Sequence, residues 1–411
     1  AEGRGEWHVF LEAAIITILC GGVTALSCAN GVPEGLTIQQ TFLLTSLVWV
    51  VLPLFGAIPF VLGATDARIV DAFFEAMSGL TTTGSTVFTG LDTLPRGILL
   101  WRGILQWLGG IGIIVVAMVF LPELRVGGMQ IFRSEAFETM GKILPRAGAI
   151  AAQISVIYVG LTLACAICYF ALGMGAFDAT VHALTTVSTG GFSTRDASFG
   201  AFSGPMEYVA SLFMILAALP FVRYVQMLNG SHGAIFRDSQ ARAFLWTIGV
   251  LVAVVFVSLL HTFPHHWEKS LREALFNITS IITGTGYASV DYMSWGAFVI
   301  TIFFFIGLIG GCAGSTACSV KIFRYQILFA SIRAQTRRIH APHAIVTARY
   351  DGRPIAEDVL SSVMTFFVFF VVTLGVLSVL LAMTGLDFVT ALSGAATALA
   401  NIGPGLGETI G

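Results

Sequence analysis

A series of apolar segments, separated by short polar stretches, constrains the fold of this chain more than any other feature. A helix needs about 20 mostly apolar residues to cross the hydrocarbon core of a bilayer. Segments that approach this length are Val9–Cys28, Gln40–Gly63, Ile98–Leu121, Ala149–Leu172, Met206–Leu228, Ala243–His261, Trp295–Gly311 and Val359–Met383. Because 56% of the 411 residues are hydrophobic and only 11% are charged, the chain has too little polar surface for a water-soluble globule. The sequence therefore predicts an all-α membrane protein.

Shorter apolar segments lie between some of these and cannot span a bilayer. They are Ala72–Leu80, Thr180–Val187, Leu271–Ile282 and Val389–Leu399. Each leads into a glycine-bearing stretch: Thr81–Ser85, Ser188–Phe192, Thr283–Tyr287 and Ala400–Pro404. Irregular backbone at membrane depth is tolerated only where it is buried in protein or lines a wet cavity. We predict four re-entrant pore helices, each followed by a loop.

The loops align with one another on one glycine each: Gly84, Gly191, Gly286 and Gly403. The aligned position six residues earlier then always holds a hydroxyl side chain: Ser78, Thr185, Ser280 and Thr397. Similarity at a regular spacing indicates an internal structural repeat. We expect four pseudo-symmetric M1–pore helix–M2 repeats around a central ion pore, with an extra N-terminal helix.

The predicted boundaries follow from this register. Residues 1–37 hold the extra helix, 38–124 the first repeat, 125–228 the second, 229–340 the third and 341–411 the fourth. The second spanning helix of the third repeat is expected to be broken. The fourth repeat is expected without its second spanning helix, since the sequence stops at Gly411.

Basic residues indicate the orientation. The links between the predicted repeats carry twelve: Arg125, Arg133, Lys142, Arg146, Arg237, Arg242, Arg324, Arg333, Arg337, Arg338, Arg349 and Arg353. The segments that hold the loops carry five: Arg68, Arg96, Arg195, Lys269 and Arg272. The positive-inside rule places the links in the cytoplasm and the loop mouths outside.

Loops of this composition suit a cation pathway. An ion in the membrane must have its water shell replaced by oxygen ligands, which backbone carbonyls and hydroxyl groups supply. The C-terminal end of each pore helix carries partial negative charge, which favours a cation over an anion. One such loop alone would be explained as helix packing, but four in register are not. The predicted filter residues are Thr82, Thr83, Gly84, Thr189, Gly190, Gly191, Gly284, Thr285, Gly286, Asn401, Ile402 and Gly403.

Small residues interrupt the second spanning segment of the third repeat. Each of the glycines at positions 307, 310, 311 and 314 weakens a helix by about 1 kcal/mol relative to alanine. Unwound backbone at this depth is typical of a gating loop, and we expect a wet cavity to satisfy its polar groups. The alternative is a close helix crossing of small residues. The predicted gate residues are Gly310, Gly311, Cys312, Ala313, Gly314, Ser315, Thr316, Ala317, Cys318, Ser319, Lys321 and Arg324.

Other functions are disfavoured. No P-loop, Rossmann or nucleophile-elbow pattern occurs with the strand context that it requires, so we do not expect an enzyme. A net charge of −2 gives no electrostatic footprint for nucleic acid. Cys165 and Cys168 lie in an apolar run and are expected to pack rather than bind metal, and His182 is expected to make a structural hydrogen bond. Potassium is the only metal ion we expect, and no organic cofactor.

Several of these motifs together resemble a known family. The loops Thr82–Gly84, Ser188–Ser193 and Asn401–Gly407, with Gly310–Thr316 and Lys321–Arg324, are similar to those of the TrkH/KtrB/HKT superfamily, and most similar to its bacterial TrkH branch. The resemblance covers nearly the whole chain. It implies potassium uptake across the cytoplasmic (inner) membrane by a homodimer. It also implies a cytoplasmic nucleotide-binding ring of the TrkA type as regulatory partner, docking on 124–148, 229–240 and 325–358.

The chain departs from this pattern in the interrupted helix. Many relatives continue the Gly-Ser-Thr run with paired glycines, whereas this chain has Ala317, Cys318 and Ser319. Two alternatives to potassium uptake stay open: a sodium-conducting or sodium-coupled relative, and a membrane scaffold subunit that conducts nothing. A serine in place of Gly84 would favour sodium, and loss of loop glycines would favour the scaffold, but all four glycines are present.

Overall fold

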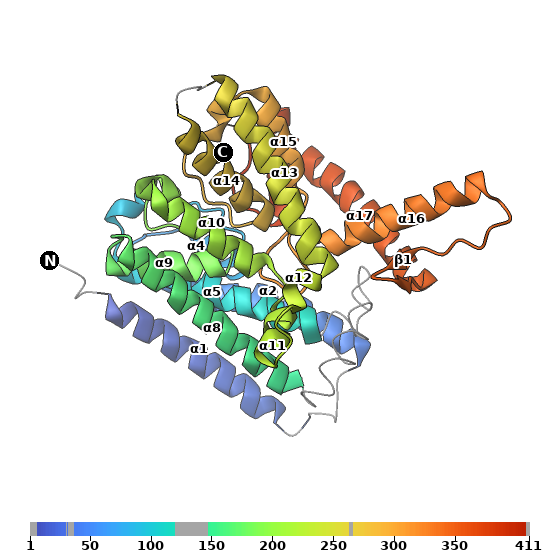
Figure 1. Cartoon of the computed structure of the whole chain (residues 1–411). Helices are drawn as coiled ribbons and strands as arrows, with labels where there is room; N and C mark the ends of the chain where they lie inside the picture. The colour runs from blue at the N-terminus through green and yellow to red at the C-terminus, as the bar shows by residue number, and fades with distance from the viewer. Residues whose placement is uncertain (1–5, 30, 32–36, 120–146, 263–265, 408–411) are drawn as a thin grey trace.

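The computed structural model describes residues 6–29, 31, 37–119, 147–262 and 266–407, and this part of the chain is almost entirely helical (Figure 1). An N-terminal helix, α1 (Trp7–Cys28), precedes four pseudo-symmetric repeats. Each repeat begins with a spanning helix and continues with a short pore helix and a loop. In the first three repeats a second spanning segment follows. The predicted all-α repeat architecture is confirmed.

The helices divide among the repeats as follows. The first contains α2 (Ile38–Gly56), α3 (Ile58–Leu62), the pore helix α4 (Ile69–Leu80) and α5 (Arg96–Val119). The second contains α8 (Ala147–Ala171), the pore helix α9 (Ala176–Val187), α10 (Pro205–Ala218) and α11 (Phe221–Leu228). The third contains α12 (Ala234–Arg237), α13 (Ser239–Thr262), the pore helix α14 (Trp267–Thr283), α15 (Ala297–Gly307) and α16 (Ile322–His340). The fourth contains the hairpin β1 (Arg349–Tyr350) and β2 (Arg353–Pro354), then α17 (Glu357–Ala382) and the pore helix α18 (Phe388–Ala400).

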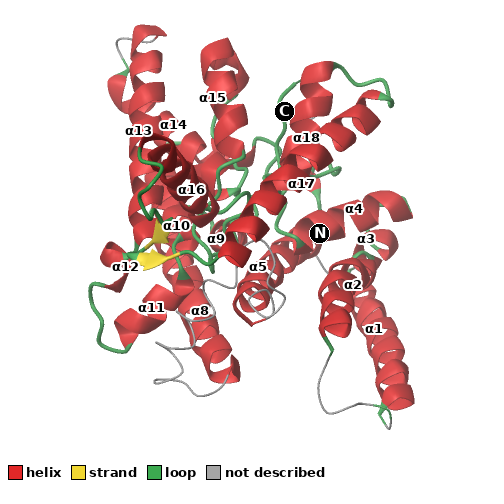
Figure 2. Ribbon diagram, turned by 90° about the vertical axis from the view of Figure 1, so that its right-hand side faces the viewer, coloured by secondary structure: helices red, strands yellow, loops and turns green. Residues whose placement is uncertain are grey.

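The repeats surround a centre into which the loops run. Figure 2 shows α1 to α4 on one side of the molecule and α13 to α15 on the other, with α5, α9 and α18 between them. Short 3₁₀ turns, Leu91–Thr93, Ser198–Phe202 and Tyr292–Trp295, follow the first three loops.

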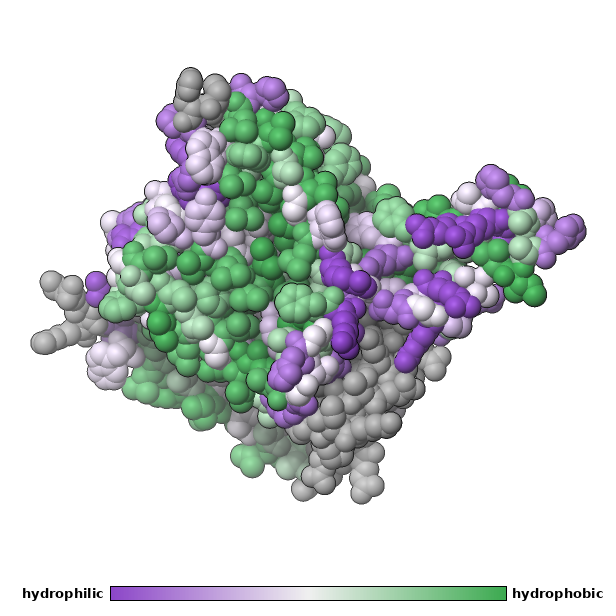
Figure 3. All heavy atoms as spheres, in the orientation of Figure 1, coloured by the Kyte–Doolittle hydropathy of each residue, from purple (hydrophilic) through white to green (hydrophobic). Residues whose placement is uncertain are grey.

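The outer helices are suited to lipid. In the part of the chain that the structure describes, six helical segments are long and apolar enough to cross a membrane: α1, α2 with α3, α5, α8, α13 and α17. The apolar stretch of α17 is only 6% buried inside the protein. Figure 3 shows a largely hydrophobic face over the spanning helices, with hydrophilic residues gathered where α16 and the β1 hairpin project. The protein crosses the membrane several times.

Two predicted spanning segments are not continuous helices. Within Met206–Leu228, α10 and α11 meet at an angle of 87°. Pro220 stands at the bend and has no N–H to continue the helix. The carbonyl of Leu216, four residues earlier, instead accepts a hydrogen bond from the hydroxyl of Tyr224 at 2.8 Å. Within Trp295–Gly311, α15 ends at Gly307, because the glycine-rich sequence beyond it favours a loop.

Aromatic side chains pack the third loop against the second repeat. Tyr287, directly after Gly286, is fully buried and lies 5.2 Å from Phe199, measured between ring centroids. Phe276 of α14 stands 4.9 Å from the same Phe199 ring. This cluster holds two neighbouring pore helices in fixed relation.

Candidate functional site

Four glycines, one from each repeat, form a closed ring of contacts. A Cβ atom added to Gly84 would lie closer than 3.0 Å to the carbonyl oxygen of Gly190 in the second loop. A Cβ added to Gly191 would meet the carbonyl oxygen of Thr285 in the third loop in the same way. In each pair the oxygen belongs to the residue directly before the aligned glycine of the next repeat.

The third and fourth loops complete the ring. A Cβ on Gly286 would meet the carbonyl oxygen of Ile402, and one on Gly403 would lie 2.6 Å from that of Thr83 in the first loop. The relation thus passes once through all four repeats and returns to its start. We call Gly84, Gly191, Gly286 and Gly403 the ring glycines. Side chains at these positions would displace neighbouring carbonyls.

The backbone of the loops also requires glycine at the ring. The φ angles are positive at all four ring glycines, with values of +87°, +77°, +80° and +98° in chain order. Such angles are accessible to glycine without the strain that a side chain brings. Two residues before each ring glycine stands a second residue with positive φ: Thr82, Thr189, Gly284 and Asn401. The four loops therefore share one backbone pattern.

These left-handed residues end the pore helices. After three of the helices an N–H group bonds to the carbonyl five residues earlier, as is typical of helix ends that close on a left-handed residue. The pairs are Thr83 to Ser78 at 2.9 Å, Gly190 to Thr185 at 2.9 Å and Ile402 to Thr397 at 3.1 Å. In the third repeat Gly286 bonds to Ser280 at 3.2 Å instead. The helices thus end beside the ring, with the negative ends of their dipoles toward it.

Side chains of the pore helices bind the segments that follow the ring glycines. Aligned positions on α4, α9 and α14 each bind a residue two or three places beyond their own ring glycine. The pairs are Glu75 with the N–H of Val87 at 3.0 Å, His182 with the hydroxyl of Ser193 at 3.0 Å, and Asn277 with the hydroxyl of Ser289 at 3.0 Å. The structural hydrogen bond expected of His182 is confirmed. Each of these three loops is therefore held by its own pore helix.

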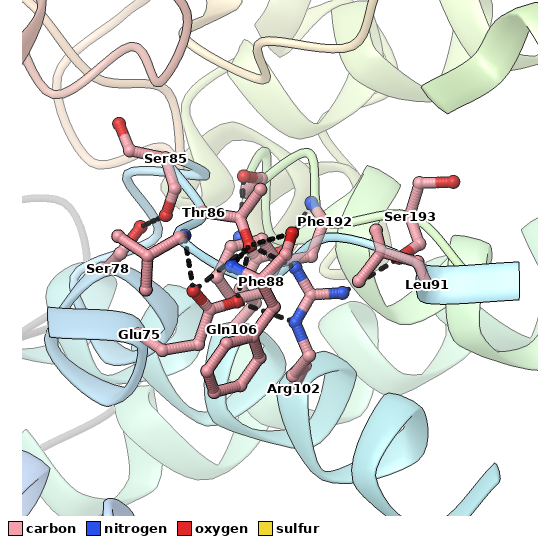
Figure 4. Close-up of polar contacts among 12 residues, drawn as sticks. Glu75, Ser78, Ser85, Thr86, Phe88, Leu91, Arg102, Gln106, Phe192 and Ser193 are labelled. Atoms are coloured by element: carbon pink, nitrogen blue, oxygen red, sulfur yellow. Dashed lines mark hydrogen bonds and ion pairs between the residues drawn. The ribbon is translucent and has the colours of Figure 1, made fainter. Parts of the chain in front are cut away.

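A buried ion pair joins the first two loops. Arg102 of α5 lies 2.7 Å from the carboxylate of Glu75, and the two side chains are 1% and 0% exposed. The same guanidinium donates to the hydroxyl of Thr86 at 3.1 Å and to the carbonyl of Ser193 at 2.9 Å. Figure 4 shows these side chains converging between the two loops. The guanidinium also lies 4.1 Å from the ring centroid of Phe192.

Gln106, one helical turn beyond Arg102, binds the second loop directly. Its amide nitrogen donates to the carbonyl of Gly190 at 2.6 Å, and its amide oxygen accepts from the N–H of Phe192 at 3.0 Å. Both bonds flank Gly191. The carbonyl of Gly190 therefore has a protein donor as well as a place in the ring.

Side chains also connect the first and fourth loops. Thr83 donates through its hydroxyl to the side-chain oxygen of Asn401. The amide nitrogen of Asn401 donates to the carbonyl of Thr81 at 2.8 Å, and the hydroxyl of Ser85 donates to the carbonyl of Gly403 at 2.8 Å. Thr285, in the third loop, shares a hydrogen bond with the hydroxyl of Thr283 at 2.7 Å. The twelve predicted filter residues are thus brought together around one ring.

The interrupted helix of the third repeat packs against the bend of the second. Residues 310–317 are buried. The N–H of Cys312 donates to the carbonyl of Ala218 at 3.1 Å, and the hydroxyl of Thr316 to that of Ala217 at 3.0 Å. In return the N–H of Phe221 donates to the carbonyl of Gly314 at 2.9 Å. Protein groups therefore pair part of this backbone, and the wet cavity beside it stays a prediction.

The end of the same loop touches the ends of two pore helices and the predicted filter residues after them. The N–H of Cys318 donates to the carbonyl of Thr283 at 3.2 Å, and the N–H of Ser319 to that of Ala400 at 2.8 Å, so both bind the last residue of a pore helix. The thiol of Cys318 lies 3.0 Å from the amide nitrogen of Asn401 and 3.7 Å from the hydroxyl of Thr82. Cys318 therefore contacts three of the four repeats.

The two basic residues after the loop are placed differently. Lys321 donates back to the carbonyl of Ala317 and so closes the end of the loop. Arg324 instead lies over the ring of Phe366 in α17, 4.1 Å from its centroid. Arg324, although predicted as a gate residue, thus connects α16 to α17.

Outside the ring, a polar network links the first and second repeats. Arg195 pairs with Asp92 at 3.2 Å and with Asp178 at 3.0 Å. The N–H of Asp196 and the side chain of Arg195 hold the pKa of Asp92 below its usual range. This network lies after the second loop and ties it to the 3₁₀ turn that begins at Leu91.

Glu75, Arg102 and Gln106 are absent from the residues predicted from the sequence, although a signal exists for the two ionisable residues, Glu75 and Arg102. Glu75 stands inside the short apolar segment 72–80, and Arg102 and Gln106 inside the spanning segment 98–121. Ionisable residues at membrane depth are rare and mark functional sites. Opposite charges in two neighbouring apolar segments predict an ion pair on this ground alone.

Comparison with known proteins agrees with this architecture. A family model for TrkH, described as a cation transport protein, matches residues 7–411. The chain is 44% identical over 390 residues to the Trk system potassium uptake protein TrkI of Halomonas elongata, covering 92% of this chain and 77% of that protein. It is 36% identical over 413 residues to the Trk system potassium uptake protein TrkH of Escherichia coli, covering 98% and 84%.

A solved structure matches the fold over its whole described length. The crystal structure of the potassium transporter TrkH from Vibrio parahaemolyticus superposes with a TM-score of 0.90 at 33% sequence identity. The match covers 99% of this chain and 85% of that one. The match therefore includes the spanning helices, the pore loops and the interrupted helix of this chain.

Proposed function

The chain belongs to the TrkH family of cation transport proteins, a family of transporters and not of enzymes, and we propose that it takes up potassium ions through its four-loop ring. The uptake system names of its relatives support potassium as the transported ion. We propose the cytoplasmic (inner) membrane as its place, with the loop mouths outside. The division into an extra helix and four repeats at 37, 124, 228 and 340 belongs to this proposal.

One observation carries the proposal. Each ring glycine lies against the carbonyl of the residue that precedes the ring glycine of the next repeat, and this relation closes on itself after four repeats. Four extended loops in this relation bring their backbone oxygens together at the centre, where a partly dehydrated cation requires oxygen ligands. The pore helices add the negative ends of their dipoles. A scaffold subunit would have no need of four positions at which any side chain collides with a carbonyl. This argument favours conduction over the scaffold alternative.

We propose the loop 310–319 as the gate. Its contacts with Thr283, Ala400 and Asn401 support this, since they seat the loop against the ends of two pore helices and one filter loop. The loop carries small side chains, so its displacement requires breaking hydrogen bonds rather than removing large groups from a core. Close packing of small residues remains the competing hypothesis.

We further propose a homodimer regulated by a cytoplasmic nucleotide-binding ring of the TrkA type. Exposed Arg333, Arg337 and Arg338 on the projecting end of α16 support a docking surface there. The described link 229–240 contacts the beginning of α16, where the side chain of Gln326 donates to the carbonyl of Ser239 at 3.1 Å. The link 124–148 lies mostly outside the described residues.

Uptake by reconstituted protein tests the proposal. Purified protein in liposomes, with and without a membrane potential, is expected to accumulate potassium and rubidium and to discriminate against sodium. Sodium uptake equal to or above potassium uptake would establish the sodium alternative. Absence of uptake of any of the three ions, in folded and inserted protein and equally in its Cys318→Gly variant, would favour the scaffold alternative.

A further inference from the structure

We infer that Arg102 is a positioning residue for ion discrimination: it fixes the first and second filter loops relative to each other from behind. The inference rests on the proposed function, because it names the residues on which the selectivity of that same ring depends. The residues to which Arg102 donates hydrogen bonds, Glu75, Thr86 and Ser193, are not among the twelve proposed filter residues. Arg102 acts through the chain segments that leave Gly84 and Gly191.

The guanidinium joins three separate segments. It binds Glu75 on the first pore helix, Thr86 after the first ring glycine and the carbonyl of Ser193 after the second. Glu75 in turn binds Thr86 and the N–H of Val87. A planar fork with five donors is suited to such simultaneous contacts, and a lysine ammonium is not. The two loops are thereby held at one spacing.

The other repeats are braced differently. His182 and Asn277, aligned with Glu75, bind Ser193 and Ser289 in the loops of their own repeats, and the fourth repeat has Gly394 at this position. Among the described residues at these aligned positions, Glu75 is the one carboxylate, and it forms an ion pair with Arg102. Of the four aligned positions, only the one in the first repeat therefore holds its loop through a charged pair that also reaches the second loop.

Gln106 extends this brace to the ring. Residues four apart lie on one face of a helix, so α5 presents Arg102 and Gln106 to the second loop together. Gln106 binds on both sides of Gly191, through the carbonyl of Gly190 and the N–H of Phe192. The position of the Gly190 carbonyl is thus set from α5. In the snug-fit account of ion selectivity, discrimination between ions of different radius depends on how firmly such oxygens keep their spacing.

Charge gives the brace a second, separable effect. Glu75 neutralises Arg102, so the pair adds no net charge behind the filter. Removing the carboxylate alone would leave a buried cation that opposes cations in the ring, since Coulomb interactions are strong in a water-poor interior. Removing both charges would restore neutrality while leaving the loops unbraced. Affinity and selectivity therefore respond to different variants.

The test compares variants in proteoliposomes. We measure the ratio of potassium to sodium uptake and the half-saturating potassium concentration for wild type, Arg102→Gln, Arg102→Lys, Glu75→Gln and the double variant of Glu75→Gln with Arg102→Gln. Both Arg102 variants are expected to lower the ratio on the order of tenfold, because neither restores the lost charged hydrogen bonds. Glu75→Gln is expected to raise the half-saturating concentration about tenfold, and the double variant to bring it back while the ratio stays low.

A matched control is available in another ion pair. Arg272 of α14 pairs with Glu207 of α10 and with Glu268, and its side chain is 11% exposed. Arg272→Gln is expected to leave the ratio within about twofold of wild type, even where it lowers stability. Equal loss of selectivity in Arg272→Gln and Arg102→Gln would overturn the inference, because both effects would then be those of general destabilisation.

A milder variant keeps the inference testable where Arg102→Gln does not fold. Gln106→Asn shortens the side chain by one methylene, strands no charge and is expected to lower the ratio several-fold. If folded Gln106→Asn and Arg102→Lys both show the same potassium-to-sodium ratio as wild type, the inference is overturned.

The ratio measured for the wild-type protein tests the proposed function separately. Where wild type transports nothing, the difference in melting temperature between potassium and sodium solutions replaces uptake, and an unchanged difference in Arg102→Lys overturns the inference.

Discussion

Cys318 donates its backbone N–H to the carbonyl of Thr283, the last residue of the third pore helix. Its thiol lies 3.0 Å from the amide of Asn401, directly after the fourth pore helix. One residue of the interrupted helix thus touches the ends of two pore helices. The proposed gate and the proposed filter meet at this position.

We expect Cys318→Gly to raise potassium flux. The variant removes the thiol contacts with Asn401 and Thr82 and makes the loop backbone more mobile. Loss of one such contact changes an open-to-closed equilibrium by about 1 kcal/mol, or roughly fivefold. Initial uptake by proteoliposomes measures this, with Cys318→Ser retaining low flux and Cys168→Ser, on α8, as control. Low flux in Cys318→Gly would favour close packing as the role of the loop.

Substitution of a ring glycine is expected to abolish selective uptake. In Gly191→Ser the added Cβ would collide with the carbonyl of Thr285 and the backbone would be strained at a φ of +77°. Such strain costs on the order of 1–3 kcal/mol before the collision is counted. Gly160 and Gly249 have nothing within 4 Å of an added Cβ, so Gly160→Ala and Gly249→Ala are matched controls. Normal potassium-over-sodium uptake by Gly191→Ser would contradict the ring as the filter.

The sequence predicts the architecture well because its signals are local. Apolar length identifies the spanning helices, and the glycine register identifies the four loops. The bend between α10 and α11 was missed, although Pro220 marks it, because apolar composition continues across the bend. The brace of Arg102 and Glu75 was missed for another reason: which loop a buried side chain reaches depends on how neighbouring helices pack. No spacing in one sequence shows that Arg102 binds the carbonyl of Ser193, a residue of the next repeat.

The network around Arg195 is expected to give a pH-dependent contribution to stability. The pKa of Asp92 is lowered in the folded protein, so its contribution is present above the ordinary aspartate pKa of about 4 and is lost as the pH falls through the lower folded value. Asp92→Asn should therefore lower the melting temperature at neutral pH but not in strong acid. Asp351→Asn, in an exposed turn, is the control. A difference from wild type that does not depend on pH would contradict this.

The projecting end of α16 is expected to face the cytoplasm. Arg337 and Arg338 are exposed there, and basic residues favour that side of the membrane. A single cysteine in place of Arg338, in a background without Cys20 and Cys28, should react with a membrane-impermeant thiol reagent only after cells are opened. A cysteine in place of Asp92 should react in intact cells. The reverse pattern would contradict both the topology and the proposed docking surface.

The bend of the second repeat is expected to hold the gate closed. Thr316 donates through its hydroxyl and its N–H to the carbonyl of Ala217, beside the bend, so opening the loop must break these bonds or carry the bend with it. Thr316→Val keeps the shape but loses the hydroxyl donor, and we expect roughly fivefold higher flux, matching about 1 kcal/mol for one hydrogen bond. Thr316→Ser keeps the donor and should behave as wild type. Selectivity should be unchanged in both, because the ring is not altered. If Thr316→Val conducts as wild type while Cys318→Gly conducts more, the loop is held by the pore helices alone and the bend has no part in gating.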